Sequence, residues 1–368
     1  MKKIYISKPK LSNNLCRNIN KIIKTSWISS AGKNVKIFEK KFQKISGKKY
    51  NTTCSSGFAA LHLAMCALDI KKGDEVIVPS LSFIATANAV YHTGAKVIFA
   101  DVNENDWNIN IEECKKKITK KTKAIVCVHL YGFPCDLKNL KKLCNEKNIF
   151  LIEDVAEAHG TKVENKMVGS YGDISCYSFY ANKIITTGEG GMCSSDNKKI
   201  IDKINTIKDH GISRKKTYYS LVPGFNYRMT NIQASIGLDQ LKNFKGLLKE
   251  KKKNHKRYLN NLKSEIENGK IIIQKSNLKD YYLSIWIFSI RINKKFGSVK
   301  NLQKLLKKKN IETRPVFYPM EIFKYFSDTK RNKMSKMISE SSLSLPSGYN
   351  LSNKEIDKIC NLIKNFIN

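Results

Sequence analysis

The 368-residue sequence lacks features that would assign it to several common classes of protein. None of its ten cysteines forms a C-x-x-C pair, which excludes a zinc ribbon and a thioredoxin-type motif. The most apolar stretch, residues 281–290, is about half the length of a membrane helix. The N-terminus begins with positive charge but has no apolar signal-peptide core behind it. We therefore expect a soluble, cytoplasmic protein with reduced core thiols and no membrane partner.

Arginine is also scarce, although the formal charge is +36. Only seven of the 67 basic residues are arginine, the side chain that base-reading and phosphate-binding surfaces favour for its bidentate geometry. The lysine runs at residues 115–117 and 249–253 lie on amphipathic helical patterns, which favours solvated helix faces. We predict no nucleic-acid partner, and a positive surface that would attract an anionic substrate.

The first two thirds of the chain alternate between strand-like and helical patterns, without internal repeats. Apolar runs of strand length occur at residues 75–79, 96–101, 123–130, 150–154 and 174–179. Helical patterns lie between them at residues 57–68, 83–92, 111–118 and 137–145. Continuous apolar strands separated by helices predict an α/β fold, with a mostly parallel sheet covered by helices.

The pattern changes after residue 243. A lysine-rich helix is predicted at about residues 241–262, followed by strands at 271–273 and 283–292 and helices at 299–308 and 354–366. We therefore predict a large domain over residues 1–243 and a smaller α+β domain over residues 244–368.

A single lysine, Lys183, follows an aromatic strand and precedes a glycine-rich segment. A lysine held among buried strands has a lowered pKa and becomes a nucleophile suited to Schiff-base formation. The alternative is a lysine that extends from the strand end into solvent.

Two acids, Glu153 and Asp154, end the apolar run at 150–154. Ligands of open parallel sheets bind at the carboxyl ends of the strands, where a carboxylate can pair with the protonated ring nitrogen of pyridoxal phosphate. A metal-binding acid or a helix cap remains an alternative.

The segment Ser56-Gly57-Phe58 opens a strongly helical run. Free N–H groups and the positive helix end make it an anion site, or in the alternative a plain helix cap. It is neither a Walker motif nor G-x-G-x-x-G, so nucleotide hydrolysis lacks support. Further along, Asn226 and Arg228 alternate with aromatic residues, which predicts an extended segment with both polar side chains on one face.

Together these motifs resemble the DegT/DnrJ/EryC1/StrS family of sugar aminotransferases, which use pyridoxal 5′-phosphate on the type I fold of aspartate aminotransferase. The likeness runs over nearly the whole chain, and its longest blocks are residues 73–80, 152–160, 182–191 and 225–234. With residues 313–317, these blocks look most like the members that convert GDP-4-keto-6-deoxymannose to GDP-perosamine.

The resemblance implies roles for individual residues. Lys183 becomes the Schiff-base lysine, Asp154 the partner of the pyridine nitrogen, and Glu157 stands where many members have Gln near the phenolic oxygen. The other implied cofactor contacts are Ser56, Gly57, Phe58, Ser178, Phe83 stacked on the ring, and Asn226 from the neighbouring subunit of a homodimer with shared sites. Implied substrate contacts are Arg228, Arg314 and Tyr318, and no metal site is expected.

Three positions depart from the family pattern. Phe58 replaces the Thr that usually follows the glycine, and Tyr318 and Glu321 stand where GDP-perosamine-forming members often carry His. The resemblance implies amino transfer from L-glutamate to C4 of the keto sugar. Relatives that dehydrate sugars have His at the position of Lys183, so this lysine favours amino transfer over dehydration. A UDP- or dTDP-linked substrate, C3 chemistry and a non-catalytic regulator stay open.

His129, His159 and His210 carry no implied role. Each is expected to be a polar residue satisfied within the fold.

Overall fold

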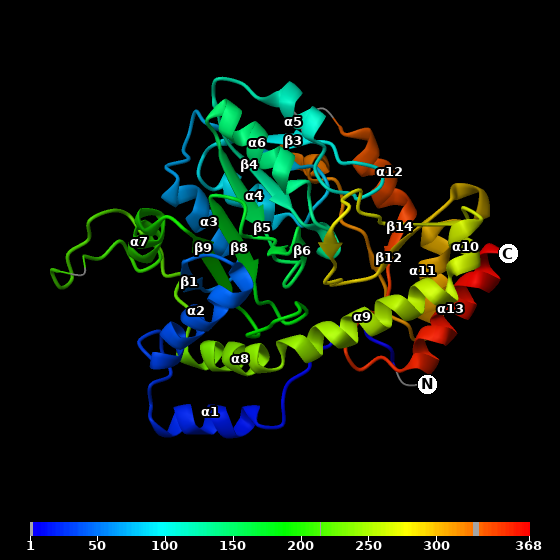
Figure 1. Ribbon diagram of the computed structural model, residues 1–368, viewed down its shortest axis with the longest axis horizontal. Coiled ribbons are helices and arrows are strands. Elements are labelled where there is room, and N and C mark those ends of the chain that lie inside the picture. The colour runs from blue at the N-terminus through cyan, green and yellow to red at the C-terminus, as the bar shows by residue number, and fades with distance from the viewer. Residues whose placement is uncertain (1–2, 214, 327–330) are drawn as a thin grey trace.

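A seven-stranded sheet forms the centre of the computed structural model, which describes residues 3–213, 215–326 and 331–368 (Figure 1). Its strand order is β1-β9-β8-β5-β4-β2-β3. The bounds are β1 (Tyr50–Cys54), β2 (Glu75–Pro79), β3 (Lys96–Ala100), β4 (Thr122–Val128), β5 (Phe150–Asp154), β8 (Ile174–Ser178) and β9 (Gly191–Ser195). Neighbours from β8 to β3 are parallel, whereas β9 runs antiparallel to both of its neighbours, β1 and β8. The predicted mostly parallel sheet is confirmed.

Helices cover both faces of this sheet because its strands are apolar on both sides (Figure 1). In β2, Ile77 joins one buried cluster while Val76 and Val78 join the other. One face is covered by α2 (Lys33–Ser46), α5 (Ile111–Lys117), α6 (Leu137–Lys147) and α8 (Asn231–Lys242). The other is covered by α3 (Gly57–Ala67), α4 (Ala85–Tyr91) and α7 (Lys198–Ile207). The N-terminal helix α1 (Leu15–Lys24) packs on α8.

The long helix predicted at about residues 241–262 is confirmed, although it begins three residues later than predicted. α8 ends at Lys242 and α9 (Phe244–Asn261) begins after Asn243, whose backbone has φ −98° and ψ 4°. The Asn243 amide donates to the carbonyl of Asp239 at 3.4 Å, a local side-chain bond that competes with helical pairing.

A second sheet, of order β10-β12-β14-β13 and wholly antiparallel, lies in the C-terminal third. Its strands are β10 (Ile271–Ile273), β12 (Ser289–Ile292), β13 (Arg314–Pro315) and β14 (Ser342–Ser344). The accompanying helices are α10 (Lys263–Glu267), α11 (Val299–Lys308), α12 (Lys333–Ser341) and α13 (Asn353–Ile367). Short 3-10 turns lie at Leu130–Gly132, Lys294–Phe296, Met320–Ile322 and Lys324–Phe326.

The strand predicted at residues 283–292 is only partly present, as β12. Residues just before it bond to the large sheet's loops instead: Ser284 N–H donates to Thr161 Oγ1, and Trp286 N–H donates to the Tyr131 carbonyl. Upstream, β11 (Tyr281–Tyr282) pairs with β6 (Lys162–Val163), which pairs with β7 (Lys166–Met167).

The N-terminal residues contact the C-terminal part of the chain. Ile4 forms a bridge with Ile311 and belongs to the buried cluster of the second sheet. The division at residues 243 and 244 stays a prediction.

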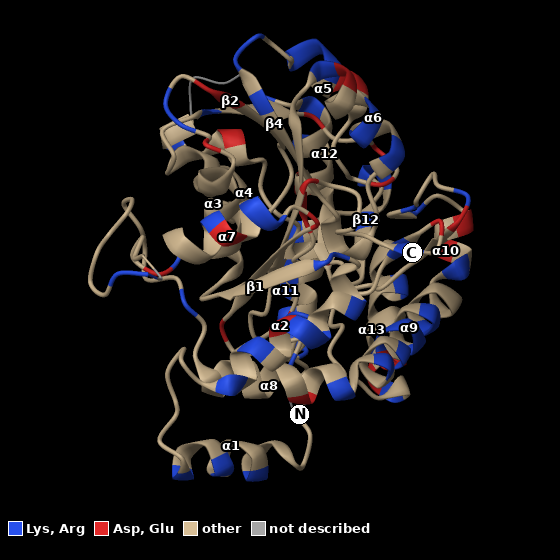
Figure 2. Cartoon of the chain, turned by 60° about the vertical axis from the view of Figure 1, so that its left-hand side comes forward, with Lys and Arg blue, Asp and Glu red and all other residues tan. Residues whose placement is uncertain are grey.

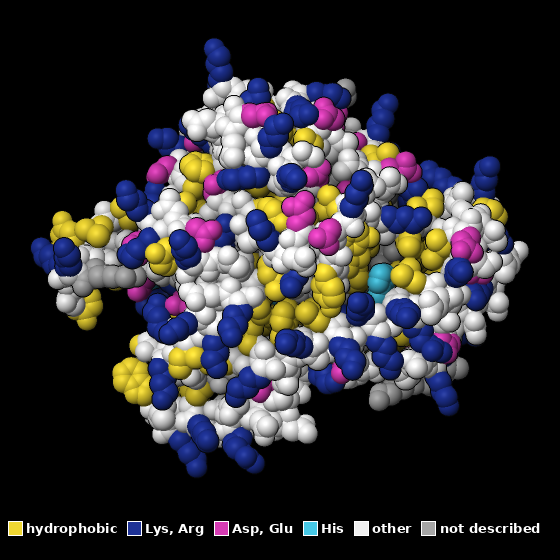
Figure 3. Space-filling model, viewed as in Figure 1, with side chains coloured by type: hydrophobic (Ala, Val, Ile, Leu, Met, Phe, Trp, Pro, Cys, Tyr) yellow, Lys and Arg dark blue, Asp and Glu magenta, His cyan; other side chains and the backbone are white. Residues whose placement is uncertain are grey.

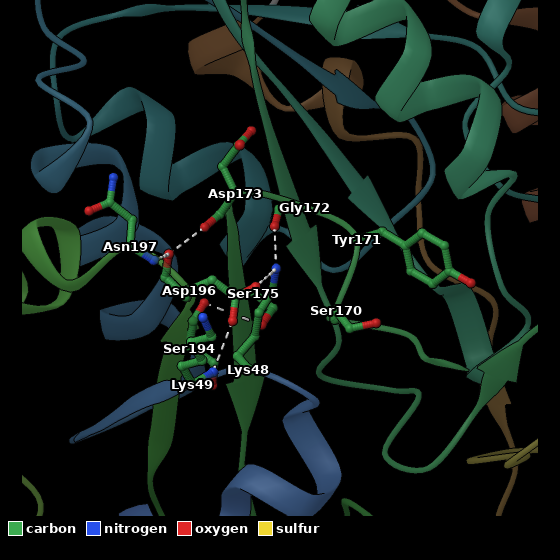
Figure 4. Close-up of polar contacts among 12 residues, drawn as sticks. Lys48, Lys49, Ser170, Tyr171, Gly172, Asp173, Ser175, Ser194, Asp196 and Asn197 are labelled. Carbon is green, nitrogen blue, oxygen red and sulfur yellow. Dashed lines mark hydrogen bonds and ion pairs between the residues drawn. The ribbon is translucent and has the colours of Figure 1, made fainter. Parts of the chain in front are cut away.

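A network of polar contacts lies at the end of the sheet opposite to the carboxyl end of β8 (Figure 4). Buried Lys48 donates to the Gly172 carbonyl at 2.8 Å and to Asp196 at 3.1 Å. The Asp196 carboxylate also accepts from the Lys49 N–H at 3.0 Å, which holds β1 and β9 together at their ends.

Basic side chains are scattered over the surface, with apolar side chains gathered at the centre of the face in Figure 3. Lys and Arg lie along the outer faces of α1, α9 and α13 (Figure 2), as predicted for solvated helices. Lys251 on α9 is an exception, since only 3% of it is exposed. Eight of the ten cysteines are buried and all ten are free. Among the described residues, no helix has the length and hydropathy needed to cross a membrane.

Candidate active site

A pocket of about 460 Å³ opens at the carboxyl ends of β5 and β8, the edge at which parallel sheets bind ligands. It brings together most of the predicted cofactor residues and Arg314. The predicted residues that line it are Ser56, Gly57, Phe58, Phe83, Asp154, Glu157, Ser178, Lys183 and Arg314.

Lys183 lies in the loop that follows β8, and its side chain is 11% exposed. Its Nζ is 3.6 Å from Glu157 Oε1 and 3.6 Å from the centre of the Trp286 ring. Burial lowers the pKa of the Lys183 amine, while Glu157 and Asp154 oppose that shift. The lowered pKa favours the neutral amine, the form that acts as a nucleophile or base.

Glu157 is held from two sides. Its Oε2 accepts the Tyr131 N–H at 2.8 Å, and its Oε1 faces Lys183. Burial raises the pKa of Glu157 to about 7, and the Lys183 charge only partly opposes it. The pocket therefore contains a carboxyl group that changes charge near neutral pH.

Asp154 and its neighbour Glu153 have separate surroundings, because successive strand residues point to opposite faces. Asp154 lines the pocket, and its Oδ2 accepts from Thr86 Oγ1 at 3.0 Å. Burial raises the pKa of Asp154. Glu153 instead bonds to His129 at 3.2 Å and to the backbone N–H groups of Gly169 and Tyr171. Glu153 is therefore structural.

The N-terminus of α3 forms one wall of the pocket. Ser56 caps the helix by accepting the Ala59 N–H at 3.0 Å, and first-turn N–H groups of a helix lack partners within the helix. A Cβ placed on Gly57 would lie 2.6 Å from the Ser178 Cβ, so only glycine permits this close approach. The pocket thus offers N–H groups and the Ser178 hydroxyl side by side, a donor set suited to a phosphate.

Aromatic rings form the remaining walls. Phe83, predicted to stack on the cofactor, is 56% exposed and meets Phe317 at 5.9 Å. Phe317 and Trp286 also line the pocket, and the Tyr131 ring packs on both of them, at 5.5 Å and 6.0 Å. The sequence assigned no role to Thr86, Trp286 and Phe317, which line the pocket, because they lie outside the four motifs. The signals available were the most apolar stretch for Trp286 and the block at residues 313–317 for Phe317.

Three predicted residues lie outside this pocket. Asn226 accepts from Arg228 Nε at 3.1 Å, and Phe225 stacks on Tyr227 at 4.9 Å, which confirms the predicted alternation. Tyr318 is 56% exposed and lines a neighbouring cavity instead. The implied roles of Asn226, Arg228 and Tyr318 stay predictions.

Two of the departures from the family pattern have a structural explanation. The Phe58 ring stacks on His62 at 5.9 Å, so this side chain packs along α3 although the residue borders the pocket. Glu321 is buried, accepting from Ser80 Oγ at 2.6 Å and from the Asn332 N–H at 2.8 Å.

The three histidines without an implied role all have partners. His129 is bound to Glu153, His159 Nδ1 accepts the Ile185 N–H at 3.3 Å, and His210 contacts Arg228 at 3.3 Å. The described residues contain no cluster of three or more side chains able to hold a metal ion.

Comparisons with known proteins match the chain over its whole length. The sequence profile of the DegT/DnrJ/EryC1/StrS aminotransferase family matches residues 9–364. GDP-perosamine synthase of Escherichia coli O157:H7 is 40% identical over 367 residues, covering 100% of this chain and 99% of that protein. GDP-perosamine synthase of Vibrio cholerae is 38% identical over 369 residues, covering 99% of each. The solved structure of an aminotransferase from Psychrobacter cryohalolentis has a TM-score of 0.93 and is 28% identical, covering 98% of both chains.

Proposed function

Because the chain belongs to the DegT/DnrJ/EryC1/StrS aminotransferase family, we propose that it converts GDP-4-keto-6-deoxymannose to GDP-perosamine with L-glutamate as donor. The enzyme is a sugar aminotransferase that depends on pyridoxal phosphate. In the proposed reaction the ketone at C4 becomes an amine and glutamate becomes 2-oxoglutarate. The two substrates exchange an amino group for a ketone oxygen, so no further oxidant or reductant is required.

The observation that carries the proposal is the arrangement around Lys183. Its amine lies beside Glu157 in a pocket that also contains Asp154 and the N-terminus of α3. When bound, pyridoxal phosphate supplies an electron sink that stabilises a carbanion next to its reactive carbon.

The donor groups in the pocket fit this cofactor. The close approach of Gly57 and Ser178 and the free N–H groups of α3 would hold the phosphate. Asp154 would pair with the protonated ring nitrogen, a cation that compensates for the burial of its carboxylate. Glu157 would face the phenolic oxygen, and Phe83 would cover one face of the ring.

Lys183 is the proposed proton carrier. Its neutral Nζ would accept the proton from the α-carbon of glutamate and, in the second half of the reaction, deliver a proton to C4 of the sugar. Arg314 lines the same pocket and is a candidate to bind the donor carboxylate or the substrate phosphate.

We further propose a homodimer with shared sites. Asn226 lies outside the pocket of its own chain, as expected for a residue that serves the neighbouring subunit. The Lys-rich surface supports an anionic substrate. The alternatives are a UDP- or dTDP-linked keto sugar, amination at C3, and a regulator without turnover.

The absorption spectrum of the purified protein tests the proposal. A visible band that bleaches with L-glutamate and returns with GDP-4-keto-6-deoxymannose would support it, and the product would be identified by mass spectrometry and NMR. Lys183→Ala should abolish the response, whereas Lys166→Ala, at an exposed position on β7, should not. Recovery only with a UDP- or dTDP-linked sugar would overturn the substrate, and a protein that binds no pyridoxal phosphate would overturn the function.

A further inference from the structure

One face of α9 holds a later part of the chain through three side-chain donors. Lys251, Asn254 and Tyr258 are spaced by three and four residues, so they share a face of the helix. They donate to the carbonyls of three consecutive residues, 346–348, at 2.6, 3.0 and 2.8 Å. This segment of the chain is therefore fixed to α9.

Lys251 differs from the other two donors because it makes a second bond. Its Nζ also donates to the Trp286 carbonyl at 2.8 Å and lies 4.9 Å from the centre of the Tyr349 ring. The side chain is buried, and none of the described salt bridges includes it. Burying a lysine without an acidic partner costs free energy. Lys251 therefore differs from the other lysines of α9, which are exposed to solvent.

Two of the residues that Lys251 contacts, Trp286 and Tyr349, bond to the backbone on either side of Lys183. Trp286 Nε1 donates to the Asn182 carbonyl at 2.7 Å, and Tyr349 Oη donates to the Ile184 carbonyl at 2.9 Å. These carbonyls belong to the residues immediately before and after Lys183. The Trp286 ring also lies 3.6 Å from the Lys183 Nζ.

We propose that Lys251 is a positioning residue for Lys183, acting through Trp286 and Tyr349; this inference rests on the proposed catalytic role of Lys183. The buried Lys251 amine contacts both Trp286 and Tyr349, whose side chains bond to the backbone of the loop that carries Lys183. Burial lowers the pKa of Lys251 to about 7. Because a neutral amine retains two N–H donors, the two carbonyl bonds persist in either charge state.

The first measurement uses cofactor-free full-length protein labelled with 5-fluorotryptophan. Its three tryptophans, Trp27, Trp107 and Trp286, give three ¹⁹F resonances, and Trp286→Phe assigns one of them. Lys251→Met should move or broaden the Trp286 resonance alone. Lys253→Met, at an exposed position on the same helix, should leave all three unchanged.

The second measurement uses the cofactor-loaded enzyme. Lys251→Met should lower kcat by about ten- to hundredfold, because small displacements of a reacting group cost this much, with a smaller change in the KM for glutamate. The pH midpoint of the visible band should also move, and Lys251→Arg, which retains donors, should restore part of both properties.

Two results would overturn the inference. One is a folded Lys251→Met protein with an unmoved Trp286 resonance, an unchanged pH midpoint and an unchanged kcat. If that variant does not fold, Tyr349→Phe decides, since it removes only the hydroxyl bound to Ile184; an unchanged kcat and midpoint would then refute the proposal. Failure of the wild-type protein to bind pyridoxal phosphate would instead refute the proposed function, because the fluorine measurement needs no cofactor.

Discussion

Replacing Glu157 with glutamine isolates the negative charge nearest to Lys183. In the wild-type protein, the Tyr131 N–H donates to Glu157 Oε2 at 2.8 Å. Glutamine keeps a side-chain oxygen that can accept this bond, so the backbone contact should survive. What disappears is the carboxylate 3.6 Å from the lysine Nζ. Because that carboxylate stabilises the positively charged form of the group at Lys183, its loss should lower the pKa at which this group releases its proton.

The size of the effect follows from this distance. Two unit charges about 4 Å apart interact by about 4 kcal/mol at an effective dielectric constant of 20. One pKa unit corresponds to about 1.4 kcal/mol, so a fully ionised carboxylate would shift the midpoint by about three pH units. Burial raises the pKa of Glu157 to about 7, so it is only partly ionised near neutrality, and we expect a fall of about one to three pH units.

The assay is a pH titration of the visible absorption of the cofactor-loaded enzyme. Glu157→Gln should titrate at lower pH than the wild-type protein, and the acid side of the kcat profile should move in the same direction. Glu164→Gln, at a side chain 58% exposed, is the matched control. A midpoint that stays in place or rises in Glu157→Gln would refute the electrostatic reasoning.

Four further predictions concern two glycines, the wall of the pocket and the core behind it. Gly57→Ala should cost about 1–3 kcal/mol of stability in urea unfolding and weaken cofactor binding, because the new Cβ would lie 2.6 Å from Ser178 Cβ. Gly246→Ala, where nothing lies within 4 Å, should instead stabilise α9 by about 0.5–1 kcal/mol. Thr86→Val should weaken cofactor affinity about ten- to hundredfold in an absorbance titration, since it removes a hydroxyl bound to the buried acid at the end of β5. Burial lowers the pKa of His159 to about 3 in the native state. Between pH 6.5 and 3, His159 therefore binds a proton in the unfolded chain but not in the native protein. Stability should therefore fall by about 1.4 kcal/mol per pH unit from this residue between pH 6.5 and 3, and urea unfolding of His159→Asn should lack that contribution.

The parts of the fold that could be predicted are those encoded by local patterns. The strands at 75–79 and 150–154 are found at the predicted residues because continuous apolar runs bounded by polar ends specify buried parallel strands. Asp154 and Lys183 could be placed at the same edge of the sheet, because Asp154 ends one strand and Lys183 follows another.

The parts that could not be predicted depend on contacts between distant segments. Trp286 reaches Lys183 from more than one hundred residues away, and no local pattern distinguishes it from a core tryptophan. Lys251 lies in a run of lysines typical of a solvated helix, yet the packing of residues 346–348 against α9 buries it.

The place of β1 at the edge of the large sheet has a consequence for synthesis on the ribosome. β1 pairs only with β9 among the described strands, and β9 follows it by roughly 140 residues. At roughly 5–20 residues per second, Tyr50–Cys54 emerges about 7–30 seconds before its pairing partner. During that interval the nascent chain presents an unpaired strand, a substrate for chaperones and a point at which two growing chains can associate wrongly.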